Sequence, residues 1–331
     1  MQARLSYKQI MNPVPSILSI GKSTQDVFLK AATAFTPYED KGVVYERLPL
    51  GSKLDLDDVI MSTGGNVTNA AVTFARQGLH ARYAWILGTD VVSEGIMREL
   101  DKEGVDTSPV VQKPEYFASY STILLAKTGE RTILNYHGTA LSSVSQLNLE
   151  ALDASDWVYI SSLANMELLE QIITHAKQAG AKVFLNPAGS ELAKPEALRT
   201  LLNDVTILAV NKEEAAQIVT GESSEELVRQ LARLVPIAVV SDGPNGVVAT
   251  DGKEIVLAGM YEDVPVVDRT GAGDAFGSGF VCQIAQGKSL QDAIIFGSAN
   301  STSVVGLIGA KAGILHEGVT LHDMPIELKP F

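Results

Sequence analysis

Short runs of apolar residues with high strand propensity alternate with stretches of helical periodicity along most of the chain. We predict buried strands at residues 83–87, 157–161, 182–185, 206–210 and 237–241. Between them, residues 69–77, 166–179 and 224–234 carry apolar positions at helical spacing. This alternation predicts βαβ units and a mostly parallel sheet covered by helices on both faces, which is the α/β class.

Two segments, residues 35–60 and 114–138, break this alternation. In the second, residues 119–125 and 131–136 are typical of strands, and residues 127–130 would form the tip of a β-hairpin. Residues 1–15 contain Pro13 and Pro15, and we expect them to form a loose extension. We expect one domain over residues 1–331, with a small lid built from the two segments. Because such insertions would otherwise expose sheet edges, we also expect a homodimer.

The composition narrows the classes of partner. A formal net charge of −13, from 39 acidic and 26 basic residues, argues against a surface for nucleic acid or for anionic membranes. No apolar run is long enough to cross a bilayer, and Cys282 is the single cysteine, so an intrachain disulfide is excluded. We therefore expect a cytoplasmic protein that acts on a small molecule. The five histidines are scattered without ligand spacing, which disfavours a His/Cys metal site.

The most informative stretch is residues 268–276, which read Asp-Arg-Thr-Gly-Ala-Gly-Asp-Ala-Phe. Apolar residues at helical spacing follow it, so Gly271, Ala272 and Gly273 would lie at the start of a helix, where unpaired N–H groups and the helix dipole can hold an anion. Asp274 is then well placed to take a proton from a hydroxyl that attacks the bound anion. The plainer interpretation is an ordinary helix start with an acidic residue in its first turn.

Two further patterns suit a polyhydroxylated ligand. Gly64 and Gly65 precede a helix that begins near Val67, and Asn66 and Asn69 supply hydrogen-bond donors and acceptors. Asp26 follows the apolar run at residues 17–20, and ligands of open α/β sheets bind at the carboxyl ends of strands. A carboxylate can accept hydrogen bonds from two neighbouring hydroxyls, although an aspartate here could simply cap a turn.

For two patterns in the second half of the chain, a purely structural explanation is as good as a functional one. Asn211 and Glu214 follow the strand predicted at 206–210, and they fit an N-cap with its capping-box glutamate. Gly243 and Gly246 lie between two strand-like runs and are typical of a hairpin turn.

Each of these patterns is weak alone, but their order and spacing together are specific. Over nearly its whole length the chain resembles the PfkB, or ribokinase-like, family of carbohydrate and nucleoside kinases. The resemblance implies a three-layer α/β/α domain with a mostly parallel central sheet and a small β-sheet lid over the sugar. It also implies that Asp274 is the general base and that the backbone of Gly271, Ala272 and Gly273 forms an anion hole.

The resemblance extends to the ligands. It implies a sugar site formed by Asp26, Gly64, Gly65, Asn66 and Asn69. It implies a nucleotide site formed by Asn211, Glu214, Ser241, Gly243, Gly246 and Asn300, with the segment Lys311-Ala312-Gly313 near the adenine. Glu214 would hold Mg²⁺ through water, and Asp268 would help to hold a monovalent cation such as K⁺. Two positions depart from the usual pattern, because Val67 replaces a frequent glycine and Arg269 occupies a slot that is often small.

We therefore expect ATP-dependent phosphoryl transfer to a hydroxyl of a sugar or sugar derivative. A nucleoside kinase of the same family is the alternative, but a nucleobase needs an apolar or aromatic slot, and aromatic residues make up only 6% of the chain. A catalytically silent sugar-binding or regulatory protein is the alternative from another class, and the presence of both Asp26 and Asp274 argues against it. Arg131, in the expected hairpin, could recognise an anionic group on the substrate, or it could be an exposed surface arginine.

Overall fold

The computed structural model describes residues 13–31, 33–126, 131–141, 143–187, 189–259, 261 and 264–331. The tip of the expected hairpin, at residues 127–130, lies outside the described residues. So does the expected N-terminal extension up to residue 12.

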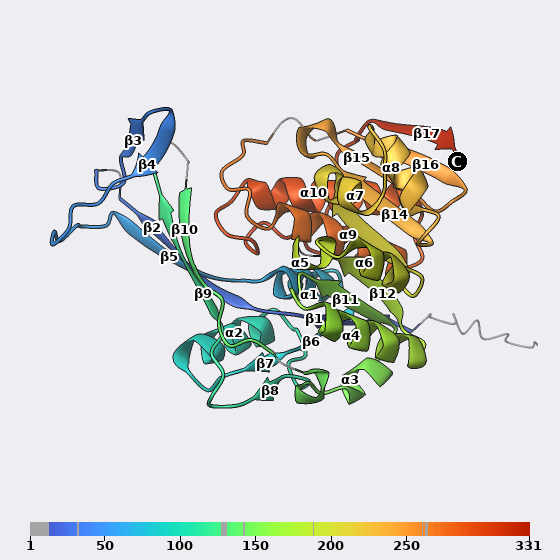
Figure 1. The fold of residues 1–331 in the computed structure, drawn as a ribbon, viewed down its shortest axis with the longest axis horizontal. Helices are drawn as coiled ribbons and strands as arrows, with labels where there is room; N and C mark the ends of the chain where they lie inside the picture. Colours follow the sequence, from blue (N-terminus) through green and yellow to red (C-terminus); the bar gives the residue numbers. More distant parts are fainter. Residues whose placement is uncertain are drawn as a thin grey trace, which may run out of the picture.

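A nine-stranded sheet forms the centre of the molecule, with strand order β17-β16-β15-β14-β13-β12-β11-β1-β6 (Figure 1). Its parallel strands are β6 (His80–Ala84), β1 (Ser16–Ile20), β11 (Trp157–Ser161), β12 (Lys182–Asn186), β13 (Ile207–Asn211) and β14 (Ile237–Ser241). Antiparallel strands complete one edge: β15 (Val247–Thr250), β16 (Glu254–Ala258) and β17 (Ile326–Pro330). The prediction of a mostly parallel sheet is thus confirmed.

Helices cover both faces of this sheet, as predicted. One layer contains α1 (Asn66–Arg76), α9 (Ala272–Ala285) and α10 (Leu290–Val305), which pack against one another. The other contains α4 (Met166–Gln178), α6 (Pro195–Leu202), α7 (Lys212–Ile218) and α8 (Ser224–Leu231). All five residues of β11 are buried, because a parallel strand in such a sandwich meets helices on both sides. The shorter elements are α2 (Val91–Lys102), α3 (Glu150–Asp153), α5 (Gly189–Leu192), η1 (Val144–Gln146) and η2 (Gly243–Asn245).

A small sheet projects from one end of this body (Figure 1). Its four strands have the order β10-β9-β2-β5, with β10 (Arg131–Tyr136), β9 (Ser119–Leu125), β2 (Thr24–Lys30) and β5 (Asp58–Gly64). The strands of the predicted hairpin are confirmed, but this sheet also takes in β2, which lies before the expected lid segment at 35–60. Two-stranded ribbons are formed by β3 (Pro37–Asp40) with β4 (Val43–Glu46), and by β7 (Ile86–Leu87) with β8 (Val111–Gln112). The strand predicted at 83–87 is therefore wrong in extent, since the chain leaves the large sheet after Ala84 and β7 pairs with β8.

The order of the strands indicates where a ligand would bind. From β1 the chain goes to its neighbour β6, whereas from β11, on the other side of β1, it goes to β12 in the opposite direction. The connections therefore diverge between β1 and β11, and open α/β sheets bind ligands at the carboxyl ends of strands at such a point. Among the described helices, none has the length and apolar character needed to cross a membrane.

Candidate active site

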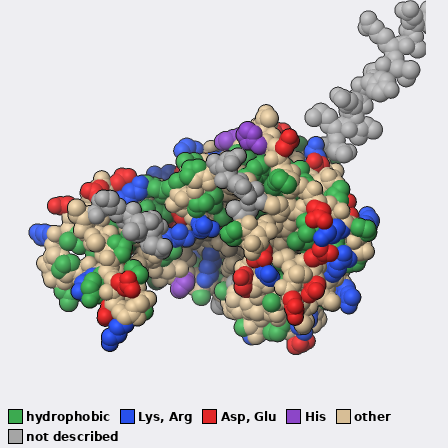
Figure 2. Space-filling model, turned by 90° about the horizontal axis from the view of Figure 1, so that it is seen from above, with side chains coloured by type: hydrophobic (Ala, Val, Ile, Leu, Met, Phe, Trp, Pro, Cys, Tyr) green, Lys and Arg blue, Asp and Glu red, His purple; other side chains and the backbone are tan. Residues whose placement is uncertain are grey.

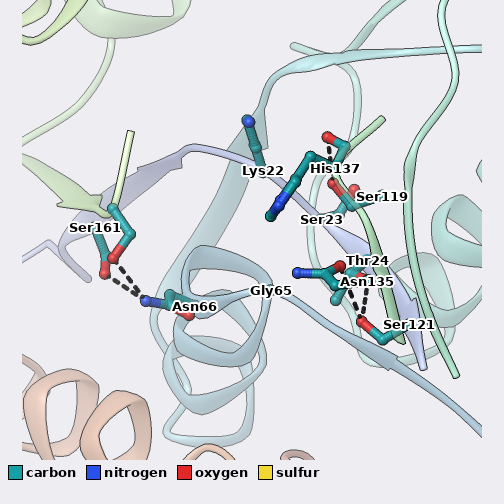
Figure 3. Close-up of a pocket in the computed structure, with 11 residues that line it drawn as sticks. Lys22, Ser23, Thr24, Gly65, Asn66, Ser119, Ser121, Asn135, His137 and Ser161 are labelled. Atoms are coloured by element: carbon teal, nitrogen blue, oxygen red, sulfur yellow. Dashed lines mark hydrogen bonds between the residues drawn. The ribbon is translucent and has the colours of Figure 1, made fainter. Parts of the chain in front are cut away.

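A small polar cavity of about 150 Å³ lies at the carboxyl ends of β1 and β11 (Figure 3). Hydroxyl side chains from both sheets line it, namely Ser23, Thr24, Ser119, Ser121, Ser161 and Ser162. Asn66, Asn135, Lys22 and His137 complete its polar wall, together with the backbone of Gly65. None of the described residues that line this cavity is Phe, Tyr or Trp. Such a wall suits a ligand rich in hydroxyl groups.

Asn66 is held firmly at the start of α1. Its amide Nδ2 donates hydrogen bonds to the hydroxyl oxygens of Ser161 and Ser162, both at 3.0 Å. Ser162 has a backbone φ of 51°, in the left-handed region that non-glycine residues seldom adopt. Ser161 in turn donates to Asn186 Oδ1 at 3.0 Å, and Asn186 lines a second, larger cavity. The two cavities are thus neighbours, because a hydrogen bond connects Ser161 in the wall of one with Asn186 in the wall of the other.

Glycine is required in the loop that leads into α1. A Cβ atom on Gly64 would overlap the carboxylate of Asp26, and one on Gly65 would lie 2.5 Å from the carbonyl oxygen of Lys22. Gly65 also has a φ of 99°, which a residue with a side chain adopts only with strain. The two glycines therefore let this loop pack closely against the first residues of the small sheet.

Asp26 lies elsewhere than the sequence suggested. It is the third residue of β2, in the small sheet, and does not directly follow the strand of the large sheet. Its side chain is only 7% exposed and accepts a 3.4 Å hydrogen bond from Thr24. Burial raises its pKa, and a hydrogen bond from Ser121 opposes that rise. Thr24 and Ser121 both line the polar cavity, so Asp26 lies directly behind that wall.

The glycine-rich turn begins a helix, as predicted. Gly271 is the N-cap of α9 and has a φ of 80°, and a Cβ atom there would overlap the methyl group of Ala310. Ala272 and Gly273 line the larger cavity. The N–H groups of a helix's first turn lack partners within the helix, so this wall offers donors and positive potential to an anion.

Asp274 connects α9 with α1. Its Oδ2 accepts a 2.9 Å hydrogen bond from Asn69 Nδ2, so the expected base and an expected substrate-loop residue lie together. Burial raises the pKa of Asp274 to about 6, and the hydrogen bond from Asn69 limits the rise. A carboxylate with such a pKa is ionised at neutral pH, yet accepts a proton more readily than an ordinary aspartate.

The larger cavity, of about 430 Å³, lies between α9 and the carboxyl ends of β13 and β14. The structure brings five of the expected nucleotide residues into its wall: Asn211, Glu214, Ser241, Gly243 and Gly246. Valine side chains and three aromatic rings make much of the remainder apolar, from Val239, Val247, Val266, Val305, Tyr159, Phe184 and Phe276. A cavity with a polar end and an apolar end is suited to a nucleotide.

Asn211 and Glu214 also form the capping box of α7. Asn211 Oδ1 accepts from Glu214 N at 2.8 Å, and Glu214 Oε2 accepts from Asn211 N at 2.9 Å. The capping-box interpretation is therefore confirmed, and the same pair also faces the larger cavity. Burial raises the pKa of Glu214.

Two expected adenine contacts lie elsewhere. Asn300 is fully buried beneath α9, where it donates to the carbonyl of Ala275 at 2.8 Å and accepts from Leu315 N at 2.9 Å. It is absent from the wall of the larger cavity, which α10 instead supplies through neighbouring residues such as Ser301. The placement of Lys311 near the adenine is wrong, because its amine contacts Asn69 in the substrate loop.

Asp268 is fully engaged by the protein. Oδ1 accepts from the N–H of Thr270 at 3.0 Å and from its hydroxyl at 2.7 Å, and Oδ2 accepts from Gly309 N at 3.2 Å. The guanidinium of Arg131, from β10 in the small sheet, lies 3.5 Å from Oδ1. Arg131 is thus neither a free surface arginine nor a wall residue of the polar cavity. No group of three or more His, Cys, Asp or Glu residues suited to a metal ion occurs in the part of the chain that the structure describes.

Sequence reasoning missed several residues of the polar cavity. Lys22 and Ser162 follow the carboxyl ends of β1 and β11, so the position of the divergence point could have indicated them. Asn135 and His137 come from β10 and the residues just after it, and only the pairing of the small sheet brings them to the cavity. Figure 2 shows the hollow between the small-sheet lobe and the larger body, with basic side chains gathered there.

Comparisons with known proteins identify the family and the fold of the chain. The sequence model described as "pfkB family carbohydrate kinase" matches residues 41–316. A ribokinase of Haemophilus influenzae is 29% identical over 279 residues, covering 80% of this chain and 88% of that protein. A guanosine-inosine kinase of Exiguobacterium acetylicum is 25% identical, covering 80% and 90%. The solved structure of an Arabidopsis thaliana ribokinase complexed with ribose and ATP has a TM-score of 0.74 at 22% identity, covering 91% of this chain and 96% of that one, and so shares the fold. The chain belongs to the pfkB family of carbohydrate kinases.

Proposed function

We propose that the protein transfers the γ-phosphoryl group of ATP to a hydroxyl of a sugar or sugar derivative. One observation carries this proposal. The carboxylate of Asp274 directly follows the helix-start turn in the wall of the larger cavity, and it is hydrogen-bonded to Asn69 of the substrate loop. The base is therefore linked to α1, whose first residue, Asn66, lines the cavity suited to hydroxyl groups, while the turn before the base lines the cavity suited to a nucleotide.

In this mechanism the acceptor hydroxyl lies in the polar cavity and gives its proton to Asp274 as it attacks the γ-phosphorus, while the bond from that phosphorus to the bridging oxygen breaks and ADP leaves. The N–H groups of Gly271, Ala272 and Gly273 stabilise the negative charge that moves between the phosphate oxygens. Little covalent work is required of the protein, because positioning and electrostatic stabilisation dominate phosphoryl transfer. Asp26 lies beside Thr24 and Ser121, which line the polar cavity. It would accept hydrogen bonds from sugar hydroxyls there.

The residues of the larger cavity fit a hydrated magnesium ion. Glu214 is a half-buried carboxylate whose pKa is raised by burial, and Asn211 lies beside it. Magnesium keeps several of its waters, so this pair would hold it without a metal-binding cluster. When bound with ATP, the ion would neutralise charge on the phosphate oxygens.

A monovalent cation fits Asp268 poorly. Both oxygens of its carboxylate already accept hydrogen bonds from the protein, and Arg131 already supplies a positive charge beside it. We therefore infer that Asp268 is not the main ligand of a monovalent cation.

The polar cavity supports a sugar more than a nucleoside. Its described wall contains hydroxyl, amide and basic groups and lacks the apolar or aromatic slot that a nucleobase needs. Relatives named ketohexokinase and 2-dehydro-3-deoxygluconokinase, besides ribokinase, phosphorylate sugars or sugar acids according to their names, whereas the guanosine-inosine kinase keeps a nucleoside as the second candidate.

The test is an ADP-release assay with ATP and magnesium over pentoses, hexoses, sugar acids, sugar phosphates and nucleosides. We expect turnover with a member of the sugar group, and loss of turnover in Asp274→Asn. Efficient turnover of nucleosides, with no sugar accepted at millimolar concentration, would show that the substrate is a nucleoside and not a sugar. No ADP release with any acceptor, in wild type and variant alike, would leave the catalytically silent sugar-binding protein as the better account.

We also propose that residues 1–331 act as one domain whose lid lies over the sugar, and that the protein is a cytoplasmic homodimer. The edge strands of the small sheet, β5 and β10, expose apolar side chains at Val59, Met61, Ile133 and Leu134. Exposed apolar residues on unpaired sheet edges favour association with a second copy. Sedimentation velocity at micromolar concentration tests this proposal, and a monomer alone would contradict it.

A further inference from the structure

Lys311 is a buried lysine at the base of the substrate loop. It follows α10, is only 4% exposed, and its amine donates three hydrogen bonds. The acceptors are the carbonyl of Thr63 at 2.7 Å, the hydroxyl of Thr68 at 3.1 Å and Asn69 Oδ1 at 2.7 Å. Thr63 lies at the end of β5, and Thr68 and Asn69 lie in the first turn of α1. Burying an ammonium group is costly, so the structure must compensate it.

The contact with Lys311 decides how Asn69 is oriented. An ammonium group can only donate, so the amide oxygen of Asn69 must face it, and the amide nitrogen then faces Asp274 at 2.9 Å. The reversed amide would set its oxygen against a carboxylate oxygen and its NH₂ group against an ammonium. Lys311 thus fixes the direction of the hydrogen bond that holds the proposed base.

The charge of Lys311 also acts on both acidic groups of the site. Its attraction lowers the pKa of Asp26 and that of Asp274, in each case against the larger effect of burial. Burial lowers the pKa of Lys311 itself to about 7, opposed by Asp26, Asp274 and, from the side of α2, Glu99 and Glu103.

Two other groups complete these surroundings. The guanidinium of Arg76 donates to the backbone carbonyl of Lys311 at 3.0 Å and is paired with Glu103 at 2.7 Å. The phenol of Tyr159 faces Asp274 from β11, and burial keeps its pKa well above the ordinary value, so it stays neutral. Lys311 is therefore the cation common to the two carboxylates of the sugar and base positions.

We propose that Lys311 is a positioning residue for phosphoryl transfer: it aims Asp274 through Asn69, and when it is charged it favours the ionised forms of Asp26 and Asp274. This role rests on the proposed function, because it requires Asp274 to be the general base. Lys311 itself touches neither cavity wall, so its effect must pass through the substrate loop.

The first test compares Lys311→Gln, which keeps a donor but loses the charge, with Lys311→Met, which loses both. Lys253→Gln is the matched control, because the side chain of that lysine is 87% exposed and pairs with Asp251 at the surface. We expect kcat to fall by about 10- to 100-fold, the usual effect of a small misplacement of a catalytic group, while KM for ATP stays within threefold or so. The acidic limb of kcat/KM should move to higher pH, because removing the cation raises the pKa of Asp274. An unmoved limb in both folded variants would overturn the proposal.

A second measurement needs no turnover and no Lys311 variant. Lysine labelled with ¹³C at Cε reports the titration of Lys311 by NMR in wild type and in Asp274→Asn. Because Asp274 raises the pKa of Lys311, its midpoint should fall in Asp274→Asn and stay unchanged in Lys253→Gln. An identical midpoint in all three proteins would refute the coupling. If wild type phosphorylates no acceptor but this shift is present, the proposed function fails while the contact between Lys311 and the acidic pair stands.

Discussion

Replacing Asp274 by Asn should lower activity and raise stability at the same time. The amide has the size of the carboxylate and can still accept from Asn69, but it cannot take a proton. Loss of a general base lowers kcat by about 10²- to 10⁴-fold, and we expect ATP affinity to stay within severalfold because the backbone donors of the turn remain. In wild type, kcat/KM should fall about tenfold per pH unit below the pKa of Asp274, about 6.

The effect on stability follows from the same pKa. Burial raises it from 3.8 to about 6, so the ionised folded state carries a penalty that the unfolded state lacks. The penalty is fully present above pH 6, shrinks as pH falls through the folded pKa, and is gone below 3.8. A rise of about two units corresponds to about 3 kcal/mol, at 1.36 kcal/mol per unit. Asp274→Asn should therefore be more stable than wild type at pH 7.5, and this advantage should vanish near pH 4.

Steady-state kinetics and urea unfolding at pH 7.5 and pH 4.5 measure both effects on the same preparations. The pairing of lower turnover with higher stability separates lost chemistry from damaged folding. Turnover within tenfold of wild type would remove Asp274 as the base. Lost turnover together with lost stability at pH 7.5 would refute the account of its burial.

Other variants test single contacts. Gly271→Ala should lower the free energy of unfolding by about 1–3 kcal/mol, since it combines a positive φ with overlap of Ala310. Gly273→Ala, whose Cβ meets no described atom within 4 Å, should leave the melting temperature unchanged but weaken ATP use, because the methyl enters space beside the anion-binding turn. Asp26→Ala should lower kcat/KM for the sugar by a factor that corresponds to a loss of at least about 2 kcal/mol of transition-state stabilisation, as expected when hydroxyl partners are left unpaired. EDTA should abolish turnover and excess magnesium restore it, while equal rates in potassium and tetramethylammonium salts would support a K⁺-independent site.

The parts that sequence predicted well are governed by local physics. A glycine with positive φ starts α9, and a capping box starts α7, so the motif and its structural cause lie within a few residues of each other. Strands β11 and β14 have the predicted bounds because a continuous apolar run in an α/β sandwich has few other solutions.

The errors arise where a distant contact decides the outcome. Lys311 bonds to Asn69, which is 242 positions earlier in the sequence, and no local pattern marks that pair. Asn300 looks like a polar residue available to a ligand, but the carbonyl of Ala275 and the N–H of Leu315 take up its amide. After β1 the chain leaves the large sheet and enters the small sheet at β2, which contains Asp26. The apolar pattern of one strand does not indicate to which sheet the next strand belongs.

Side chains of the small sheet form part of the site. Thr24, Ser119 and Ser121 belong to its strands and line the polar cavity, so a sugar that fills this cavity must contact both sheets. The ion pair of Arg131 with Asp268 also joins the sheets, but Arg131 is 32% exposed and Asp268 keeps three protein donors without it. A partly exposed pair of this kind contributes at most about 1 kcal/mol. Hydrogen bonds to the sugar would therefore contribute more than this pair to holding the small sheet over the polar cavity.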